Sequence, residues 1–355
     1  MTQPRPVPMN RRELLLAGAS CTTLLALPAR AWSSPGFDIV ADPSGRDGAL
    51  PSLSAALDRA RKLGRPARIL VRGRHAEKLH IDIPGLTLVG APGATIVYGA
   101  SAGQNDPDGK PWGTGGSATL TVDAAGVTLQ GLAIANSFDF LSSRPSGEHG
   151  GRQAVALSLA GGADRSVIRD CDLTGYQDTF YLREGRALVE NCRISGGTDF
   201  IFGGAAALFR RCRIVSRLVP GAPIQGYVPA PSTPARQEAG LVFDRCRLER
   251  EPGVPDDSVF LGRPWRAGGN MELTGMAAFV GCWMDRHIRP EGWTAMHFRA
   301  PNGPEGWLTP QQARLYEQGS RGPGAGKASD VRRPLPGALA GIARPARIFG
   351  DWFPA

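Results

Sequence analysis

The sequence lacks the short motifs that mark the most common hydrolase and nucleotide-binding sites. No G-x-S-x-G elbow, H-E-x-x-H zinc motif or P-loop occurs in its 355 residues. Histidine is scarce, with five residues that form no compact motif, at positions 75, 80, 149, 287 and 297. These absences argue against serine-hydrolase, zinc-hydrolase and phosphate-loop chemistry, and they leave carboxylates and amides as the candidate catalytic groups.

Sequence signals for a metal or an organic cofactor are also missing. The chain has six cysteines but no C-x-x-C pair and no Cys/His cluster of the kind that binds zinc. Residues 113–118 fit the start of a dinucleotide-binding loop, but the strand-like run 119–123 follows where such a loop requires a helix. We therefore expect no cofactor and no metal.

The charge pattern contains no basic run with interleaved aromatic residues, so a nucleic-acid partner is not expected. The net charge is +9, with 41 Lys and Arg against 32 Asp and Glu. The first 31 residues carry four arginines and one glutamate, so the rest of the chain carries +6. This excess is explained either by a polyanionic partner or by a coding bias towards Arg, Ala, Gly and Pro.

No apolar run is long enough to cross a bilayer as a permanent helix. The N-terminal run is about 14 residues long; Arg11 and Arg12 precede it, as in a Tat-type signal, and an A-x-A cleavage site ends at Ala31. We expect residues 1–31 to be an export signal and residues 32–355 to be one exported domain, periplasmic or secreted and free of the membrane. Lipid attachment at Cys21 is an alternative, although the apolar run continues past it.

Long helical patterns are absent apart from one. In residues 53–63 the apolar residues fall on one helical face, which predicts a short helix capping the N-terminal end of a solenoid. Gly (47) and Pro (30) are abundant and favour turns. Short β-prone runs follow at close spacing, at residues 67–71, 78–83, 86–89, 94–97, 127–134 and 154–159. The pattern predicts an all-β fold, because no helices alternate with the strands.

What the sequence does contain is a repeat in residues 171–203. Cys171 and Cys192 are 21 positions apart, and so are Asp178 and Asp199. A fixed period of about 20–25 residues is typical of a solenoid of stacked coils. Because stacked strands lie about 4.8 Å apart, we expect the two carboxylates to face each other at near-contact distance. Two carboxylates that close do not both ionise easily.

The repeat continues at longer intervals. The apolar–Cys unit recurs 20, 34 and 36 residues further on, at Cys212, Cys246 and Cys282. The longer intervals predict long loops near residues 217–238 and 248–274. We place these loops on the side of the repeat that carries the aspartates, where they could form a substrate cleft.

The repeat also predicts that the cysteines share one inward position. Cys171, Cys192 and Cys212 would then form a buried ladder of small apolar residues. Five cysteines remain after removal of the leader, so at least one is a free thiol unless chains are cross-linked. A disulfide between neighbours such as Cys192 and Cys212 remains an alternative after export.

Two further polar residues are candidates for the site. Gln177 precedes Asp178, so in a regular strand the two point to opposite sides unless the backbone bends, which Gly175 would permit. Arg263 could fork one aspartate bidentately and hold it ionised and oriented. A purely structural ion pair is the alternative for this arginine.

Three segments together resemble the motif blocks of the pectin methylesterase family: Gly175–Tyr181, Asp199–Gly203 and Leu261–Trp265. Residues 153–157 are similar to a fourth block, and residues 314–319, 322–325 and 350–352 are similar to the family's C-terminal segment. The resemblance covers residues 37–355. It implies a right-handed parallel β-helix that acts on methyl-esterified pectin as a monomer, without a cofactor.

The resemblance also implies a mechanism. Asp199 is the nucleophile that attacks the methyl ester, and Asp178 is the general acid that protonates methanol and then the base that activates water. Gln177 and Gln153 stabilise the oxyanion, and Arg263 orients Asp199. The residues implied to line the sugar cleft are Trp265, Tyr181, Phe202, Tyr227 and Met296.

The chain departs from the family pattern at three points and leaves rival functions open. His75 stands where Tyr is usual, Gly197-Thr198 precedes the second aspartate, and Phe180 replaces a common Leu. The rivals are a β-helix glycosidase or calcium-dependent lyase, an esterase or thioesterase for a non-pectin substrate, and a carbohydrate-binding solenoid without activity.

Overall fold

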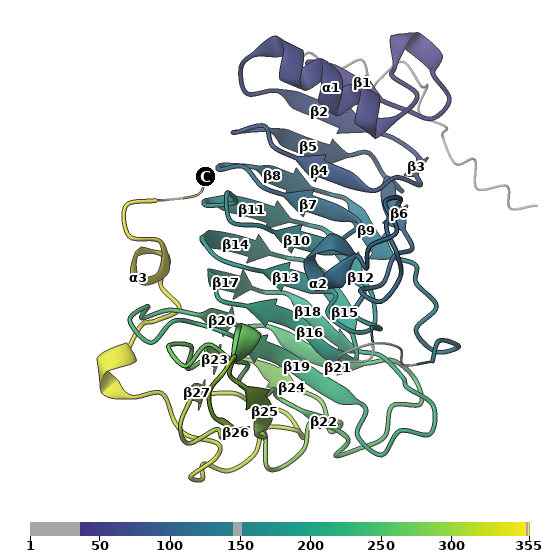
Figure 1. Cartoon of the computed structure of the whole chain (residues 1–355). Coiled ribbons are helices and arrows are strands. Elements are labelled where there is room, and N and C mark those ends of the chain that lie inside the picture. The colour runs from purple at the N-terminus through teal and green to yellow at the C-terminus, as the bar shows by residue number, and fades with distance from the viewer. Residues whose placement is uncertain (1–35, 145–150, 353, 355) are drawn as a thin grey trace, which may run out of the picture. The chain divides into compact units, whose positions relative to one another are not determined.

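The computed structural model describes residues 36–144, 151–352 and 354, and residues Phe37–Ala355 form one compact unit. The predicted export signal, with Cys21, lies outside the described residues. In the compact unit the chain winds coil upon coil, and each full coil contributes one strand to each of three parallel sheets (Figure 1). The predicted right-handed parallel β-helix is confirmed.

The three sheets run the length of the solenoid. The ten-stranded sheet contains β1 (Ile39–Ala41), β2 (Arg68–Val71), β5 (Thr87–Gly90), β8 (Thr128–Gln130), β11 (Ser166–Arg169), β14 (Arg186–Glu190), β17 (Ala206–Arg210), β20 (Leu241–Asp244), β23 (Met276–Val280) and β27 (Arg314–Gln318). The eight-stranded sheet contains β3 (Arg74–His75), β6 (Thr95–Tyr98), β9 (Ala133–Asn136), β12 (Asp172–Thr174), β15 (Arg193–Gly196), β18 (Arg213–Ser216), β21 (Arg247–Arg250) and β24 (Trp283–Met284). The seven-stranded sheet contains β4 (Leu79–Ile81), β7 (Leu120–Val122), β10 (Leu157–Leu159), β13 (Phe180–Leu182), β16 (Thr198–Gly203), β19 (Gly226–Pro231) and β22 (Val259–Phe260).

The predicted capping helix is α1 (Leu53–Leu63), and it covers the N-terminal end of the solenoid (Figure 1). The side chain of Ser52 caps its first turn by accepting a hydrogen bond from the Ala55 amide at 3.1 Å, and Gly64 ends it in the left-handed conformation. The other helical pieces are short: α2 (Gly113–Gly116), α3 (Pro345–Phe349) and 3₁₀ turns at Arg46–Gly48, Ala267–Gly269 and Gly337–Leu339.

A single left-handed residue turns several coils from the ten-stranded sheet into the eight-stranded sheet. Asp170, Asn191, Arg211 and Arg245 have φ angles of 51–55°, and a cysteine follows each of them. The left-handed conformation costs a non-glycine residue roughly 1–2 kcal/mol, and it turns the chain within one residue. The small side chain that follows then fits the crowded corner inside the solenoid.

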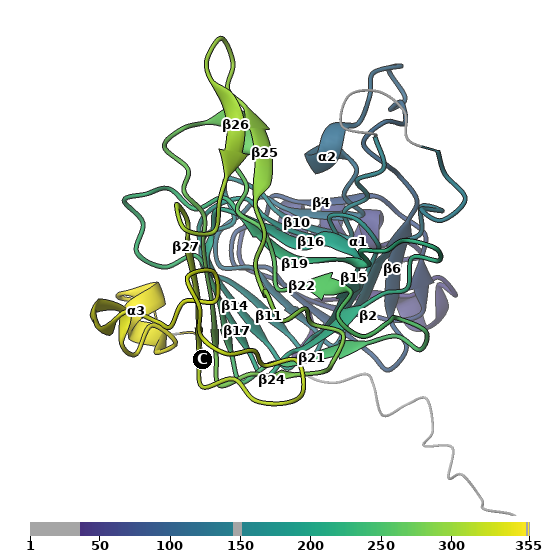
Figure 2. The same cartoon turned by 90° about the horizontal axis from the view of Figure 1, so that it is seen from below.

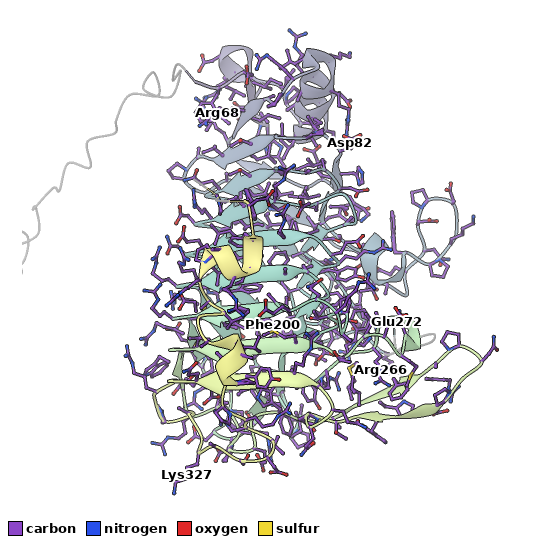
Figure 3. The ribbon with its side chains drawn as sticks, turned by 90° about the vertical axis from the view of Figure 1, so that its left-hand side faces the viewer. Arg68, Asp82, Phe200, Arg266, Glu272 and Lys327 are labelled. Atoms are coloured by element: carbon purple, nitrogen blue, oxygen red, sulfur yellow. The ribbon has the colours of Figure 1, made fainter. Side chains whose placement is uncertain are left out.

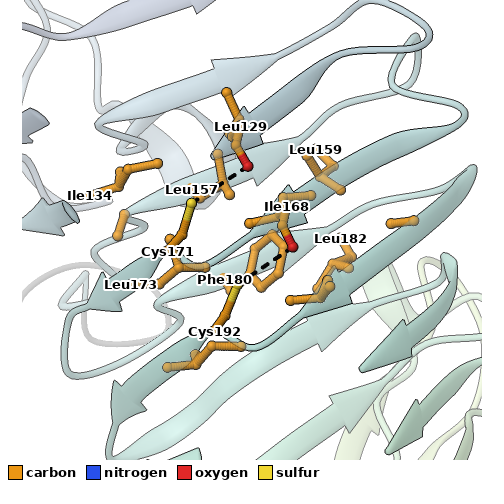
Figure 4. Packing of buried hydrophobic residues seen from close by; sticks show 14 of the residues in the cluster. Leu129, Ile134, Leu157, Leu159, Ile168, Cys171, Leu173, Phe180, Leu182 and Cys192 are labelled. Carbon is orange, nitrogen blue, oxygen red and sulfur yellow. Dashed lines mark hydrogen bonds between the residues drawn. The ribbon is translucent and has the colours of Figure 1, made fainter. Parts of the chain in front are cut away.

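The cysteines form the predicted buried ladder, and the disulfide alternative is not found. All five thiols from Cys171 to Cys282 are free and buried. Each sulfur lies against a backbone carbonyl of the previous coil: Cys171 Sγ is 3.6 Å from Leu129 O, and Cys192 Sγ is 3.5 Å from Ile168 O (Figure 4). Each thiol is thus engaged with a strand of the ten-stranded sheet instead of bonding to the neighbouring sulfur.

The ladder makes a prediction about thiol chemistry. In the chain without residues 1–31, we expect none of the five cysteines to react with Ellman's reagent while folded, because each is at most 2% exposed. All five should react in guanidinium chloride without reductant. A titration that finds only three thiols in the denatured, unreduced protein would show that one pair is oxidised.

The predicted long loops lie at two corners of the solenoid. Residues 217–225 and 251–258 lead from the eight-stranded to the seven-stranded sheet, and residues 232–240 and 261–275 lead from the seven-stranded to the ten-stranded sheet. Residues 217–225 lead into β19, and in this loop Arg217 donates a hydrogen bond to the Gly175 carbonyl at 3.0 Å. The two predicted loop regions are not continuous. Strand β19 interrupts the first, and strands β21 and β22 interrupt the second, so residues 261–275 form a separate loop after β22. The antiparallel hairpin of β25 (Met296–Arg299) and β26 (Glu305–Leu308) and the segment that carries α2 both extend from the solenoid (Figure 2).

Candidate active site

The two aspartates occupy the same position on successive coils, as the repeat predicts. Phe180 in β13 pairs with Ile201 in β16. Asp178 lies two residues before Phe180, and Asp199 lies two residues before Ile201. The amide of Asp178 donates a hydrogen bond to the carbonyl of Thr198 at 3.1 Å. Parallel neighbours lie about 4.8 Å apart, so this register brings the two carboxylates to adjacent coils at one corner.

The backbone bend that the sequence assigned to Gly175 lies at the aspartates themselves. Asp178 has a φ angle of 63° and Asp199 one of 50°, whereas Gly175 is not among the residues with positive φ. Asp and Asn tolerate this conformation better than other side chains. The bend interrupts the alternation of the strand, so Gln177 and Asp178 are not forced to opposite sides. Gly175 is needed for a different reason, because a Cβ there would lie 2.7 Å from Thr179 Oγ1.

Arg263 pairs with only one of the two aspartates. Its Nε donates to Asp199 Oδ1 at 2.9 Å, and its Nη2 donates to Asp199 Oδ2 at 2.6 Å. This bidentate geometry fixes the plane of the carboxylate. The guanidinium also lies over the ring of Tyr227, 3.9 Å from its centroid, so the cation is itself held in place.

The two carboxyl groups have different electrostatic environments. Asp178 and Asp199 are both buried, at 8% and 6% exposure. Burial and, next, the negative charge of Asp199 raise the pKa of Asp178 well above its ordinary value, while the positive charge of Arg263 acts in the opposite direction. The site therefore combines a carboxylate paired with arginine and a carboxyl group whose surroundings favour its protonated form.

The two glutamines lie on neighbouring coils at the same corner. Gln177 is next to Asp178, and its carbonyl accepts a hydrogen bond from the amide of Ala154 at 3.1 Å. Gln153 precedes Ala154 and is half-buried, like Gln177. This backbone contact between neighbouring coils places both glutamines at the same corner as the aspartates.

The aromatic residues predicted to line a cleft form a group next to this corner. Tyr181 and Phe202 stack with ring centroids 4.4 Å apart, and Trp265 lies 5.7 Å from Phe202. Tyr181 and Trp265 are partly exposed, but Phe202 is only 2% exposed. Phe202 therefore supports its two neighbours, and its predicted contact with the sugar stays a prediction.

Tyr227 and Met296 have different positions from this aromatic group. The guanidinium of Arg263 packs on the ring of Tyr227, and this ring stacks with that of Phe260 at 5.6 Å between ring centroids. Tyr227 therefore helps to hold the arginine in position. Met296 begins the β25–β26 hairpin, where Arg266 lies over the ring of Phe298 at 4.4 Å. Arg266 is labelled in Figure 3, where Phe200 marks the inside of the solenoid.

Aromatic and cationic contacts that local sequence spacing does not indicate support the Gln177 side of the corner. Tyr176 stacks with Phe140 at 5.2 Å between ring centroids, and Arg217 lies 3.8 Å from the centroid of the Tyr176 ring. Tyr176 stands within the recognised block 175–181, but its partners are far away in sequence and only folding brings them together.

Within the described ranges there is no cluster of three His, Cys, Asp or Glu side chains suited to a metal, and no helix is long and apolar enough to cross a membrane.

Comparison with known proteins agrees with this geometry. A family model described as Pectinesterase matches residues 39–332. The chain belongs to the pectinesterase family. This pectinesterase-family chain is 36% identical to pectinesterase A of Dickeya chrysanthemi over 339 residues. The aligned region covers 90% of this chain and 92% of the relative. It is 31% identical over 268 residues to a probable pectinesterase A of Aspergillus niger, across 71% and 72% of the two chains.

Solved structures show the same relationship to this pectinesterase-family chain. The pectin methylesterase of Erwinia chrysanthemi superimposes with a TM-score of 0.84 at 35% identity, covering 91% of this chain and 99% of that one. A crystal structure of a pectin methylesterase in complex with a hexasaccharide gives the same values. The enzyme of Yersinia enterocolitica superimposes with a TM-score of 0.78 at 34% identity, covering 85% and 99% of the chains.

The bidentate contact of Arg263 leads to a prediction. In the Arg263→Lys variant we expect kcat to fall about 10²-fold, because an ammonium retains the charge but cannot make two parallel hydrogen bonds to Asp199. Arg61→Lys, at the capping helix, is the matched control and should leave kcat unchanged. Initial rates of ester hydrolysis measure both. A near-normal kcat in Arg263→Lys would show that charge alone is sufficient at this position.

Proposed function

We propose that the protein hydrolyses the methyl esters of galacturonate units in pectin, releasing methanol and leaving free carboxylates. As a member of the pectinesterase family it is a carboxylic ester hydrolase. The observation that carries the proposal is the asymmetric aspartate pair. Asp178 and Asp199 are equivalent in the repeat, but Arg263 forks only Asp199.

In the first half of the reaction, the carboxylate of Asp199 attacks the ester carbonyl carbon and forms a tetrahedral intermediate. The side-chain amides of Gln177 and Gln153 donate hydrogen bonds to the oxyanion, and each such donor is typically worth about 10²–10³ in rate. The carbon–methoxy bond then breaks, and Asp178 gives its proton to the departing methanol. The galacturonate acyl group remains on Asp199.

In the second half, Asp178 is a carboxylate and acts as the base. It takes a proton from a water molecule, whose oxygen attacks the acyl carbon and releases Asp199. The product is a galacturonate carboxyl group, and Asp178 regains its proton. The raised pKa of Asp178 suits this cycle, because the group is protonated when the ester arrives and regains a proton readily.

The sugar chain would lie across the partly exposed aromatic surface of Tyr181 and Trp265, with the β25–β26 hairpin and Met296 to one side. Aromatic faces suit this task because sugar rings present apolar C–H faces. The stack of Tyr181 on Phe202 fixes the orientation of that surface.

The deciding experiment is methanol release from methylated pectin in the presence of a chelator, with the chain length of the polymer followed in parallel. We expect methanol release without loss of chain length. Depolymerisation, or a requirement for calcium, would instead support the glycosidase or lyase alternative. Hydrolysis of an acyl-thioester without any activity on pectin would point to a different ester substrate.

We further propose that the active form is an exported monomer that has lost residues 1–31. The twin arginines and the A-x-A site support export. Expression of the full chain with its N-terminus sequenced in the exported fraction tests this. We expect the mature chain to begin at Trp32, and a lipid-modified chain beginning at Cys21 would overturn the proposal.

A further inference from the structure

Two arginines and two aromatic rings beside the active-site corner form a continuous series of contacts, here called the four-residue stack. The rings of Phe140 and Tyr176 are nearly parallel, at 7°, with centroids 5.2 Å apart. Arg152 lies 3.8 Å from the centroid of the Phe140 ring, and Arg217 lies 3.8 Å from that of the Tyr176 ring. The contacts therefore run in the order Arg152, Phe140, Tyr176, Arg217. Cation–π and stacked contacts of this kind restrain each side chain in the series.

Both ends of the four-residue stack are also tied to the backbone. Arg152 donates a hydrogen bond through Nη2 to the carbonyl of Phe140, the residue whose ring it covers. Arg217 donates through Nη1 to the carbonyl of Gly175 at 3.0 Å, one residue before the ring that it covers. Because each guanidinium has a backbone partner besides its ring, the stack is held at both ends.

The four-residue stack contacts the chain next to each of the two glutamines of the site. Arg152 directly precedes Gln153, and Tyr176 directly precedes Gln177. The two segments already share one backbone hydrogen bond, from the amide of Ala154 to the carbonyl of Gln177 at 3.1 Å. The stack adds a second link between these segments, made by side chains.

Tyr176 also has a link to the coil of Asp199. Its carbonyl accepts a hydrogen bond from the amide of Gly197 at 2.7 Å, and Gly197 lies two residues before Asp199. The backbone that carries this ring is thus bound to the coil of the nucleophile, and the ring itself is linked to the segment of Gln153. A shift of the ring would move Gln177 relative to both.

We propose that the four-residue stack positions Gln177 and Gln153 so that both side-chain amides donate to one oxyanion. This inference rests on the proposed function and adds positioning residues to it. The oxyanion forms only when Asp199 attacks, so a displaced amide weakens the transition state more than it weakens substrate binding. A misplacement of about 1 Å can cost about 10²-fold in rate. Loss of the stack should therefore lower kcat and leave KM nearly constant.

The test is a double-mutant cycle between Tyr176→Leu and Gln177→Ala, measured as methanol release from methylated pectin. We expect Tyr176→Leu alone to lower kcat about 10–100-fold with little change in KM, because Leu fills space but has no ring to stack. In the Gln177→Ala background the same change should cost at least about threefold less, because the amide that it positions is gone. Tyr176→Phe keeps the ring and should recover most of the loss.

Trp283→Leu is the matched control for the loss of a ring covered by a cation. Trp283 lies in β24 of the eight-stranded sheet, and Arg247 is 4.4 Å from the centroid of its ring. This variant loses a contact of the same kind away from the glutamines, so its kcat should equal that of the wild-type protein.

A second cycle, between Arg152→Met and Gln153→Ala, covers the case in which Tyr176→Leu does not fold. Met keeps an apolar side chain of similar length but places no cation over Phe140, and we expect the same pattern in kcat. Equal losses with and without the glutamine, or a rise in KM with kcat unchanged, would overturn the proposal and leave the stack with a purely structural role.

Hydrogen exchange at the Ala154 amide separates this inference from the proposed function. That amide donates to the Gln177 carbonyl, so its protection reports how the two segments are held without any substrate. It should exchange faster in Tyr176→Leu than in the wild-type protein, and at the wild-type rate in Trp283→Leu. Faster exchange in a protein that releases no methanol would count against the proposed function alone. Unchanged exchange in Tyr176→Leu would show that the stack does not hold the two segments.

Discussion

Asp199→Asn is expected to abolish methanol release, with a loss of at least about 10⁴-fold in kcat. The amide has nearly the shape of the carboxylate, but it is a poor nucleophile and cannot form the acyl-enzyme. It can still accept one hydrogen bond from Arg263, so the surrounding corner should remain in place. Methanol release under saturating pectin measures the effect, and circular dichroism with thermal melting confirms the fold.

Asn is a better replacement than Ala at this position for a backbone reason. Asp199 has a φ angle of 50°, a conformation that Asn tolerates and that adds roughly 1–2 kcal/mol of strain to most other residues. Asp170→Asn is the matched control, because Asp170 has a φ angle of 53° at an exposed corner away from the site. Near-normal turnover in Asp199→Asn would refute its assignment as the nucleophile.

Asp178→Asn is expected to lower kcat about 10³-fold and to remove the alkaline limb of the pH profile. In the wild-type protein, kcat/KM should fall as the pH rises through the raised pKa of Asp178, because the general acid is then lost. The amide does not titrate, so the residual activity of the variant should show no decline in that range. A retained alkaline limb would assign the titration to another group.

The same variant should be more stable than the wild-type protein at pH 7. Well below the ordinary Asp pKa of about 3.9 the carboxyl is protonated in both the folded and the unfolded chain, so the two proteins should have similar stability. As the pH rises, the unfolded chain ionises first, and the wild-type protein loses stability until the pH passes the raised folded-state pKa. The difference in melting temperature should therefore grow from pH 4 upwards. A constant difference across this range would contradict the burial of a protonated Asp178.

The fold could be predicted well from the sequence because its repeat is local. The spacing of Cys171 and Cys192 equals that of the two aspartates, and this period predicted stacked coils and the relative placement of Asp178 and Asp199. The helix at residues 53–63 was also correct to the residue. The run 127–134 was predicted as one strand, but it contains β8 and only the first two residues of β9, because Gly131 turns the chain between them with a φ angle of 67°.

The structure differs from the expectation at the site where the backbone conformation decides. The bend was assigned to Gly175 because glycine commonly supplies positive φ, but the aspartates themselves adopt it. The family resemblance implied that Phe202 lines the sugar cleft, and the structure places this ring against Tyr181 and Trp265 with 2% exposure. The spacing of residues in the sequence does not show which residues adopt a positive φ angle. It also does not show that the ring of Trp265 packs against Phe202.

The sequence by itself determined the repeat, and with it the placement of two identical carboxyl groups at equivalent corners of adjacent coils. A period fixes such equivalence because each coil repeats the backbone path of the one before. The repeat did not decide which aspartate is paired. The family resemblance implied Asp199, and the tertiary structure shows the contact, in which Arg263 reaches Asp199 across 64 residues of sequence. In the proposed mechanism, that contact and the burial of Asp178 give the two groups different roles, one as nucleophile and the other as proton donor.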